Sequence, residues 1–247
     1  MQLFIIRHCE SENNALWKRT GSDNGRFSDP ALTTVGQQQA QVLADFLSRA
    51  SAQKAENSSA GMEFDNFNFT HLYCSLMRRS VQTGTPIAKA LNLPLVAHYD
   101  IHERGGIYLK DPQTEVNEGL PGPNRAHFEQ HHPELILPES LGEKGWWNRS
   151  YEDTDQALER ARVFLRWLEN EHGGGEDRVA IITHGGFIQS LIAVLLGADL
   201  LYVEVKPERE IWIKSNNGSI SRVDFWSDFI RVSYVNRVEF YPPYLIT

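Results

Sequence analysis

Short, uninterrupted runs of apolar residues constrain the fold of this chain more than any other feature of its sequence. Leu3-Phe4-Ile5-Ile6 lies near the amino terminus, and Val179-Ala180-Ile181-Ile182-Thr183 lies in the last third of the chain. Runs of this length are typical of strands that are buried on both faces, as in a parallel sheet. Thr70-His71-Leu72-Tyr73-Cys74 predicts a third strand of the same sheet.

Helical patterns alternate with these strands. The apolar spacing predicts four helices: from Thr33 or Thr34 through Leu47, from about Arg79 to a stop before Pro94, from about Asp155 to Glu171, and from Gly186 to Leu196. Strands that alternate with helices indicate an α/β fold with a mainly parallel central sheet.

The remaining segments complete a single domain over residues 1–247, a length that one hydrophobic core can serve. Residues 48–66 are rich in Ser, Ala, Asn and Glu and predict a solvated loop. Residues 105–150 show no clean periodicity, so we expect an irregular excursion with one short helix near 125–132. In the tail, alternation over 211–213, 219–225 and 230–235 predicts hairpin strands that complete the sheet.

Composition excludes several classes of protein. The formal net charge of −8 argues against a nucleic-acid-binding surface, which needs a basic face. No apolar run is long enough to span a membrane, and no signal peptide is evident. Two cysteines, Cys9 and Cys74, are too few for a disulfide framework and favour a reducing, cytoplasmic location. Any attraction for an anionic substrate must therefore come from a local cationic pocket.

Polar residues follow three of the predicted strands at the point where each strand ends. Arg7-His8 follows the first, Ser75 and Arg79 follow the second, and His184-Gly185-Gly186 follows the third. Ligands of open α/β sheets bind beyond the carboxyl ends of the strands, so these segments can converge on one pocket. Two histidines, two arginines and the amides at a helix start predict a phosphate site without identifying a nucleophile.

Several motifs resemble those of one known family, the histidine phosphatase superfamily, also called phosphoglycerate mutase-like. Arg7-His8-Cys9-Glu10-Ser11-Glu12-Asn13-Asn14 is similar to its R-H-G-E-x-x-x-N signature. The later matches keep the family's order: Leu32 to Ala40, Ser75 to Thr83, His102 to Gly106, Thr183 to Gly186, and Val235 to Val238. The resemblance covers nearly the whole chain, is weakest over 48–66 and 107–150, and implies a three-layer sandwich with helices on both faces of the sheet.

The resemblance also implies a role for each matched residue. His8 would attack phosphorus and form a phosphohistidine, while Arg7, Arg79 and His184 would bind the equatorial oxygens. Glu103 would protonate the leaving alkoxide and later deprotonate the attacking water. No metal or other cofactor is needed in this mechanism, because arginines supply the positive charge.

Further residues are candidates for contacting the phosphate or the rest of the substrate. Asn14 matches the family's phosphate-binding asparagine, although Asn13 beside it leaves the register open, and Gly185 is expected to donate its amide. Arg104, Tyr108, Asn124 and Arg125 are expected near the part of the substrate that does not react. Trp146-Trp147 and Tyr108 are interpreted either as an apolar lid or as packing of the excursion, and packing is the commoner role. His131-His132 has no metal-ligand spacing around it.

Cys9 departs from the family, which has glycine beside the nucleophile. A side chain there is expected to crowd the turn or to change the orientation of His8. Redox control through Cys9 and Cys74 is a second hypothesis, set against the commoner case of two inert buried thiols.

Three functions fit the sequence. The first is a phosphatase that hydrolyses a small phosphorylated metabolite. The second is a cofactor-dependent phosphoglycerate mutase, which the segment Glu103-Arg104-Gly105-Gly106-Ile107-Tyr108 makes less favourable because it lacks the mutases' R-H-Y-G-G-L-x-G run. The third is a catalytically weakened module that binds a phospho-ligand, which only Cys9 favours. A homodimer is compatible with any of the three.

Overall fold

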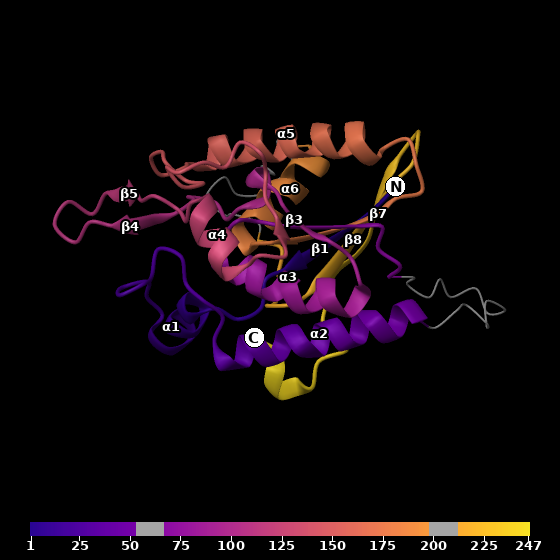
Figure 1. The fold of residues 1–247 in the computed structure, drawn as a ribbon, viewed down its shortest axis with the longest axis horizontal. Helices are drawn as coiled ribbons and strands as arrows, with labels where there is room; N and C mark the ends of the chain where they lie inside the picture. Colours follow the sequence, from indigo (N-terminus) through magenta and orange to yellow (C-terminus); the bar gives the residue numbers. More distant parts are fainter. Residues whose placement is uncertain (53–66, 198–211) are drawn as a thin grey trace, which may run out of the picture.

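A seven-stranded sheet forms the centre of the molecule (Figure 1). The computed structural model describes residues 1–52, 67–197 and 212–247. The strands in spatial order are β6 (Leu135–Ile136), β3 (Leu95–Ala97), β2 (His71–Cys74), β7 (Arg178–Thr183), β1 (Gln2–Arg7), β8 (Ile220–Phe225) and β9 (Ile230–Arg237). The first five are mutually parallel, and β8 and β9 are antiparallel additions at one edge.

The three strands predicted from apolar runs are neighbours in this sheet. Leu3 pairs with Val179 and Arg7 with Thr183 in the β1–β7 ladder, and Cys74 pairs with Ile182 in the β2–β7 ladder. Because the strands are parallel and nearly in register, their carboxyl ends lie at one edge of the sheet. The residues that follow them therefore start from adjacent positions.

Both faces of the sheet are covered. Phe4 and Ile6 belong to a core shared with the helices α2 (Thr34–Ala52) and α3 (Arg78–Leu91), whereas Leu3 and Ile5 belong to a core shared with α5 (Thr154–His172) and α6 (Gly185–Leu195). Alternate side chains of a strand point to opposite faces, so one uninterrupted apolar run serves both cores. Figure 1 shows α5 and α6 on one side of the sheet and α2 and α3 on the other. The predicted α/β fold with helices on both faces is confirmed.

One helix was not predicted. Helix α1 (Glu12–Thr20) follows β1 directly and contains no fully buried residue, so it carries no apolar stripe in the sequence. Its start is set locally, because the hydroxyl of Ser11 accepts from the amide of Asn14 and the side chain of Asn14 accepts from the amide of Ser11.

Other predicted boundaries need correction. Helix α2 continues to Ala52, so the first part of the expected loop 48–66 is helical, and 53–66 lie outside the described residues. Trp212 and Ile213 are not in a strand, and Ile211 also lies outside the described residues. The two later tail strands form the expected hairpin, β8 with β9.

The excursion contains more regular structure than expected. The short helix predicted near 125–132 is present as α4 (Arg125–His131). A two-stranded hairpin of β4 (Tyr108–Lys110) and β5 (Asn117–Gly119) projects from the body of the fold (Figure 1), and β6 extends the main sheet. Strands of two or three residues are too short to leave a periodic signal.

Trp147 attaches the excursion to the domain. Its ring is completely buried and lies 4.9 Å, centroid to centroid, from the ring of His102. It also lies against Gly106, where a Cβ would come within 2.1 Å of the indole, so only glycine fits beneath it. The packing hypothesis is therefore confirmed for Trp147, while Tyr108 faces a cavity described below. None of the helices in the described part of the chain is both long and apolar enough to cross a membrane.

Replacing Trp147 is expected to destabilise the protein strongly. The change Trp147→Ala removes a completely buried aromatic side chain and is expected to lower the free energy of unfolding by about 3–5 kcal/mol. Urea unfolding followed by circular dichroism measures this difference. Trp17, which is 59% exposed, supplies the control: Trp17→Ala is expected to change stability by about 0.5 kcal/mol or less. Equal effects of the two changes would contradict the packing role of Trp147.

Candidate active site

The polar residues that follow β1, β2 and β7 converge on one cavity. Its volume is about 630 Å³. The lining includes the predicted residues Arg7, His8, Asn13, Asn14, Arg79, Glu103, Arg104, Tyr108 and Gly185, together with Ser11, Arg26, Pro30, Gly186, Gln189, Trp212, Ile213, Lys214 and Ser215. Five of these side chains are arginine or lysine and one is glutamate, so the cavity is cationic although the chain as a whole is acidic. Such a cavity favours an anionic ligand.

His8 lies at the floor of this cavity and is only 2% exposed. Its Nδ1 lies 2.7 Å from the carbonyl oxygen of Cys9, and the Nε of Arg79 donates to its Nε2 at 3.2 Å. Burial, followed by the charges of Arg79 and Arg7, holds the pKa of His8 well below its usual 6.5. In a neutral ring with the Nδ1 proton directed to a carbonyl, the lone pair of Nε2 accepts the N–H of Arg79.

His184 lies beside His8, with the ring centroids 5.0 Å apart. It is completely buried, its Nε2 is 2.6 Å from the hydroxyl of Ser75, and its Nδ1 has no hydrogen-bond partner in the described part of the chain. Burial and the charge of Arg79 lower the pKa of His184 well below its usual value. An unpartnered polar atom in the interior is costly, so Nδ1 is an unused hydrogen-bonding group, although His184 itself is not among the residues that line the cavity.

The two arginines are held in place with part of their hydrogen-bonding capacity unused. Arg7 donates to the carbonyl of Ser215, and its buried Nε lacks a partner among the described residues. Arg79 is 6% exposed and lies 3.8 Å from a carboxylate oxygen of Asp29. Burial is the main cause that lowers the pKa of both guanidinium groups. Asp29 faces Arg79, and Glu103 acts on both guanidinium groups, but five cationic side chains against one lining carboxylate leave net positive charge in the cavity.

The side chain of Glu103, from another segment, is held by hydrogen bonds at the N-terminus of α6. Its Oε1 accepts from the amides of Arg104 at 2.9 Å and Phe187 at 3.2 Å. A Cβ on Gly186 would come within 2.4 Å of this oxygen, so the glycine makes room for the carboxylate at the helix N-terminus. The arrangement places one carboxylate on the wall of a cationic cavity.

Arg160 supports the segment that carries Glu103. It donates to the backbone carbonyls of Asp100 at 2.7 Å and His102 at 3.0 Å, and it forms a buried two-point ion pair with Glu152. Removing either partner of such a buried pair leaves an uncompensated charge. Arg160 was missed in the sequence, where it is one of several charges on a long amphipathic helix.

The two asparagines of the first motif have different surroundings. Asn13 donates to and accepts from the backbone of Phe27, so both ends of its amide hold the loop after α1. The oxygen of Asn14 accepts from Ser11 and from Asn217, which leaves its amide NH2 without an acceptor among the described residues. Both residues line the cavity, and Asn14 is the one with a donor available.

Asn217 joins the part of the cavity that Asn14 lines to the last residues of the chain. Its Nδ2 also donates to the carbonyl of His8 at 3.1 Å, and its Oδ1 accepts from the hydroxyl of Thr247. Gln39, which is completely buried, accepts from the amide of Glu10 and donates to the carbonyl of Leu245. Residues far apart in sequence thus hold the turn after β1, and no local motif marks Asn217.

Cys9 does not disturb that turn. Its side chain is completely buried away from the cavity lining, and its amide donates to the hydroxyl of Thr83 at 3.0 Å. Its backbone is not among the described non-glycine residues with left-handed φ, so the position does not require glycine. Burial raises the pKa of the Cys9 thiol to about 12 and also raises that of Cys74. The expected crowding is not observed, and both thiols have the properties of inert core residues rather than redox sensors.

The mouth of the cavity combines cations with aromatic rings. The guanidinium of Arg26 lies 4.0 Å from the centroid of the Tyr108 ring, and that of Arg104 lies 5.7 Å from the ring of Trp212.

The prediction that Asn124 and Arg125 lie near the substrate is wrong. Asn124 caps α4, and Arg125 donates to the carbonyls of Leu141 and Pro138, so neither residue lines the cavity.

Asp29 was not anticipated, because it follows no strand and belongs to no motif. Its carboxylate accepts from the amide of Arg78 at the start of α3 and faces Arg79. Burial raises the pKa of Asp29 from its usual 3.8 to about 6, although Arg79 opposes that rise.

The raised pKa of Asp29 predicts a pH dependence of stability. The folded state holds this proton more tightly than the unfolded state, so its contribution to stability falls as the pH rises from about 4 to about 6. Asp29→Asn keeps the acceptor for Arg78 and removes the titration. We expect its free energy of unfolding, relative to wild type, to increase by on the order of 3 kcal/mol between pH 4 and pH 7. Urea unfolding across this range measures the difference.

Asp23→Asn, a change to an exposed carboxylate of the same loop, serves as the control and should give no such slope. A pH-independent difference between Asp29→Asn and wild type would contradict the raised pKa.

Comparison with known proteins agrees with this geometry. A family model described as histidine phosphatase superfamily (branch 1) matches residues 54–238. Phosphoglycerate mutase-like protein 4 from Arabidopsis thaliana is 27% identical over 195 residues, which cover 77% of this chain and 69% of that protein. Phosphoserine phosphatase 1 from Hydrogenobacter thermophilus is 27% identical over 202 residues, covering 81% of this chain and 78% of that protein.

A solved structure shows the same fold. A mutant of phosphoserine phosphatase from Entamoeba histolytica, in complex with phosphoserine, superposes with a TM-score of 0.57 at 18% identity, covering 97% of this chain and 98% of that one. The range matched by the family model starts beyond Arg7 and His8, yet the fold brings both residues to the cavity that the matched motifs line. The chain therefore belongs to branch 1 of the histidine phosphatase superfamily, as its motifs predicted, and to the class of phosphoric monoester hydrolases.

Proposed function

We propose that this protein hydrolyses a small phosphomonoester through a phosphohistidine intermediate on His8. The observation that carries the proposal is the state of His8: a neutral, buried imidazole whose Nε2 faces Arg79 and whose Nδ1 is committed to the carbonyl of Cys9. A ring kept neutral by burial and, in second place, by neighbouring cations is a nucleophile at neutral pH. The same cations attract the phosphate dianion that it attacks.

The first step forms the bond between Nε2 of His8 and phosphorus while the bond to the leaving oxygen breaks. Arg7 and Arg79 form ion pairs with the equatorial oxygens, and the Asn14 amide and the Gly185 N–H donate hydrogen bonds to them. His184 contributes its Nδ1 proton when the hydroxyl of Ser75 donates to Nε2. Each unused donor of the cavity floor then has an oxygen to bind, and the arginines take the place that a metal has in other phosphoryl-transfer sites.

Glu103 supplies the proton that the leaving alkoxide needs. In the second step the same carboxylate removes a proton from water, whose oxygen attacks the phosphohistidine and releases inorganic phosphate and neutral His8. Glu103 lines the same cavity as His8, and we assign it to the leaving group because it is the one carboxylate among the lining residues and a carboxylate would repel the equatorial oxygens. A pure binding module has no use for an acid at this position.

The substrate class follows from the cavity mouth. Arg26, Arg104 and Lys214 are additional to the two arginines of the floor, and the rings of Tyr108 and Trp212 lie beside two of them. This lining favours a small phosphate ester that carries a second anionic group, such as a carboxylate. Cytoplasmic location, metal-free catalysis, one domain over residues 1–247 and a homodimer remain predictions from the sequence.

The role of His8 is tested with a panel of phosphorylated sugars, phosphoserine, phosphoglycerates and para-nitrophenyl phosphate. Wild type is expected to release phosphate, and His8→Ala is expected to lose this activity because no nucleophile remains. Brief reaction with 32P-labelled substrate, followed by an alkaline quench, should trap an acid-labile phosphoenzyme only in wild type. His127→Ala, which changes an exposed histidine, is the matched control and should retain full activity.

Each other outcome points to a different function. Interconversion of 3- and 2-phosphoglycerate without net phosphate release would favour a mutase. Binding of phosphate without turnover by the folded wild type would favour a phospho-ligand-binding module. Turnover retained in His8→Ala would contradict the proposed nucleophile.

The role of Glu103 is tested by the dependence on leaving group. Glu103→Gln keeps the shape and an acceptor for the amides of Arg104 and Phe187 but cannot donate as an acid. We expect kcat/KM for an alkyl phosphate to fall by about 10²–10⁴-fold. For para-nitrophenyl phosphate the fall should be much smaller, because nitrophenolate leaves without protonation. Equal losses on both substrates would assign Glu103 a role other than that of the acid.

A further inference from the structure

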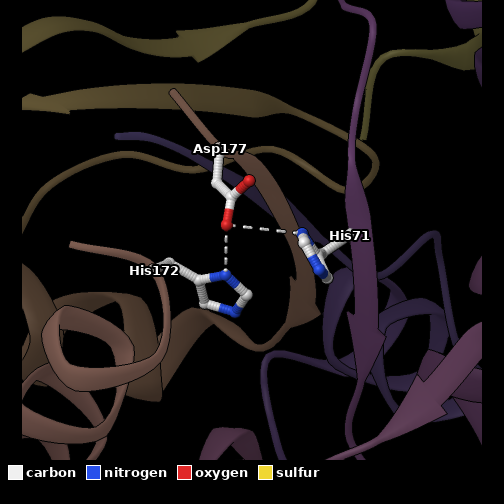
Figure 2. A group of neighbouring side chains, drawn as sticks. All are labelled: His71, His172 and Asp177. Carbon is white, nitrogen blue, oxygen red and sulfur yellow. Dashed lines mark hydrogen bonds and ion pairs between the residues drawn. The ribbon is translucent and has the colours of Figure 1, made fainter. Parts of the chain in front are cut away.

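A second cluster of titratable side chains lies at the opposite end of the sheet. Figure 2 shows His71 at the start of β2, His172 at the end of α5, and Asp177 just before β7. The carboxyl end of β7, followed by His184, belongs to the candidate active site. Six residues of extended chain, about 20 Å, therefore separate the cluster from that site.

The three side chains are arranged around one point. Oδ2 of Asp177 lies 2.8 Å from Nδ1 of His172 and 3.8 Å from Nδ1 of His71 (Figure 2). One ligand atom from each residue lies within 4.8 Å of the other two. Tetrahedral zinc binds nitrogen and oxygen ligands at about 2.0–2.2 Å, which puts pairs of ligands about 3.3 Å apart. The observed separations bracket that value, so small rotations of the side chains complete a three-point site.

The least exposed member of the cluster is oriented by its neighbours. His172 has only 4% of its side chain exposed, and its Nε2 lies 3.1 Å from the hydroxyl of Tyr73. The rings of Tyr73 and Trp167 pack edge-on against it. A hydrogen bond to the second ring nitrogen is the usual means by which proteins direct a metal-binding imidazole. Nδ1 of His172 therefore points at the carboxylate without further adjustment.

The other two members leave an approach from solvent. His71 and Asp177 have 41% and 31% of their side chains exposed. Thr70 contacts both of them: its hydroxyl is 2.9 Å from Nδ1 of His71 and 3.5 Å from Oδ1 of Asp177. Glu171 is a second carboxylate in the same region, near Tyr73. The local field thus favours a cation, unlike that of the active-site cavity.

We propose that His71, His172 and Asp177 bind one divalent transition-metal ion of the zinc class. Two imidazoles and one carboxylate are ligands that suit Zn²⁺ and its neighbours Co²⁺ and Ni²⁺, and they match the hard ions Mg²⁺ and Ca²⁺ poorly. Solvent occupies the fourth position. A metal ion on Nδ1 of His172 takes the place of the proton that this nitrogen shares with Asp177.

The site is structural. It joins the first residue of β2 to the end of α5 and the residue before β7, and none of its three residues is among those that line the phosphate cavity. Metal binding therefore adds stability to the amino end of the sheet without entering the chemistry at its carboxyl end.

The test is titration of the purified, chelator-treated full chain with ZnCl2 by calorimetry and by thermal unfolding at pH 7.5. We expect one site per chain and a rise in Tm of roughly 5–10 °C when zinc is about 100-fold above its Kd. Both effects should disappear in His71→Ala, a half-exposed position whose replacement should leave Tm in chelator unchanged. In Co²⁺, wild type should show the visible absorption of a low-coordinate site, and His71→Ala should not.

A second histidine pair supplies the matched control. His127 and His131 are one helical turn apart on α4, with ring centroids 4.5 Å from each other, but the described residues include no third ligand there. His131→Ala should keep the zinc site and the Tm shift of wild type. Zinc binding that survives in His71→Ala, or that is lost in His131→Ala, would overturn the proposal, as would no saturable binding to folded wild type.

Discussion

Uncompensated positive charge at the floor of one cavity is the constraint on which the rest of the site depends. The guanidinium groups of Arg7 and Arg79 are largely buried, and the nearest carboxylates are 3.8 Å away or lie on the cavity wall. Burial, assisted by the same charges, holds the pKa of His8 well below its usual value and so keeps the lone pair of its ring available. In the reaction that we propose, a phosphate group would pair with both arginines and accept a hydrogen bond from the unused amide NH2 of Asn14.

Hydrogen bonds from residues around the cavity hold the groups of the site in place. Arg160 holds the carbonyls that precede Glu103, Asn217 holds the carbonyl of His8 and the side chain of Asn14, and Asp29 holds the start of α3 beside Arg79. Each of these groups is polar, largely buried and engaged in hydrogen bonds or ion pairs. These contacts hold the backbone and side chains around His8, Asn14, Arg79 and Glu103, and the phosphoryl transfer that we propose relies on such positioning.

The parallel sheet separates two kinds of chemistry. At the carboxyl ends of β1, β2 and β7, strand ends and helix starts present amides and cations, which suit an anion. At the amino ends of β2 and β7, the cluster of His71, His172 and Asp177 presents lone pairs and negative charge, which suit a cation. The length of the strands keeps the two apart, so a stabilising ion at one end need not influence the reaction at the other.

The sequence by itself determined what depends on neighbours along the chain. Apolar runs predicted three buried strands, periodicity predicted the long helices, and residues at strand ends predicted His8, Arg79 and His184, because a strand and its following turn are local structures. Short polar elements such as α1 and the β4–β5 hairpin could not be predicted from the sequence, since they carry no apolar stripe. Only the tertiary structure decided that Asn14 rather than Asn13 keeps a free donor, that Cys9 faces the core, and that Asp29, Arg160 and Asn217 support the site. Those roles arise when distant segments are brought within hydrogen-bonding distance, and no single stretch of sequence encodes that distance.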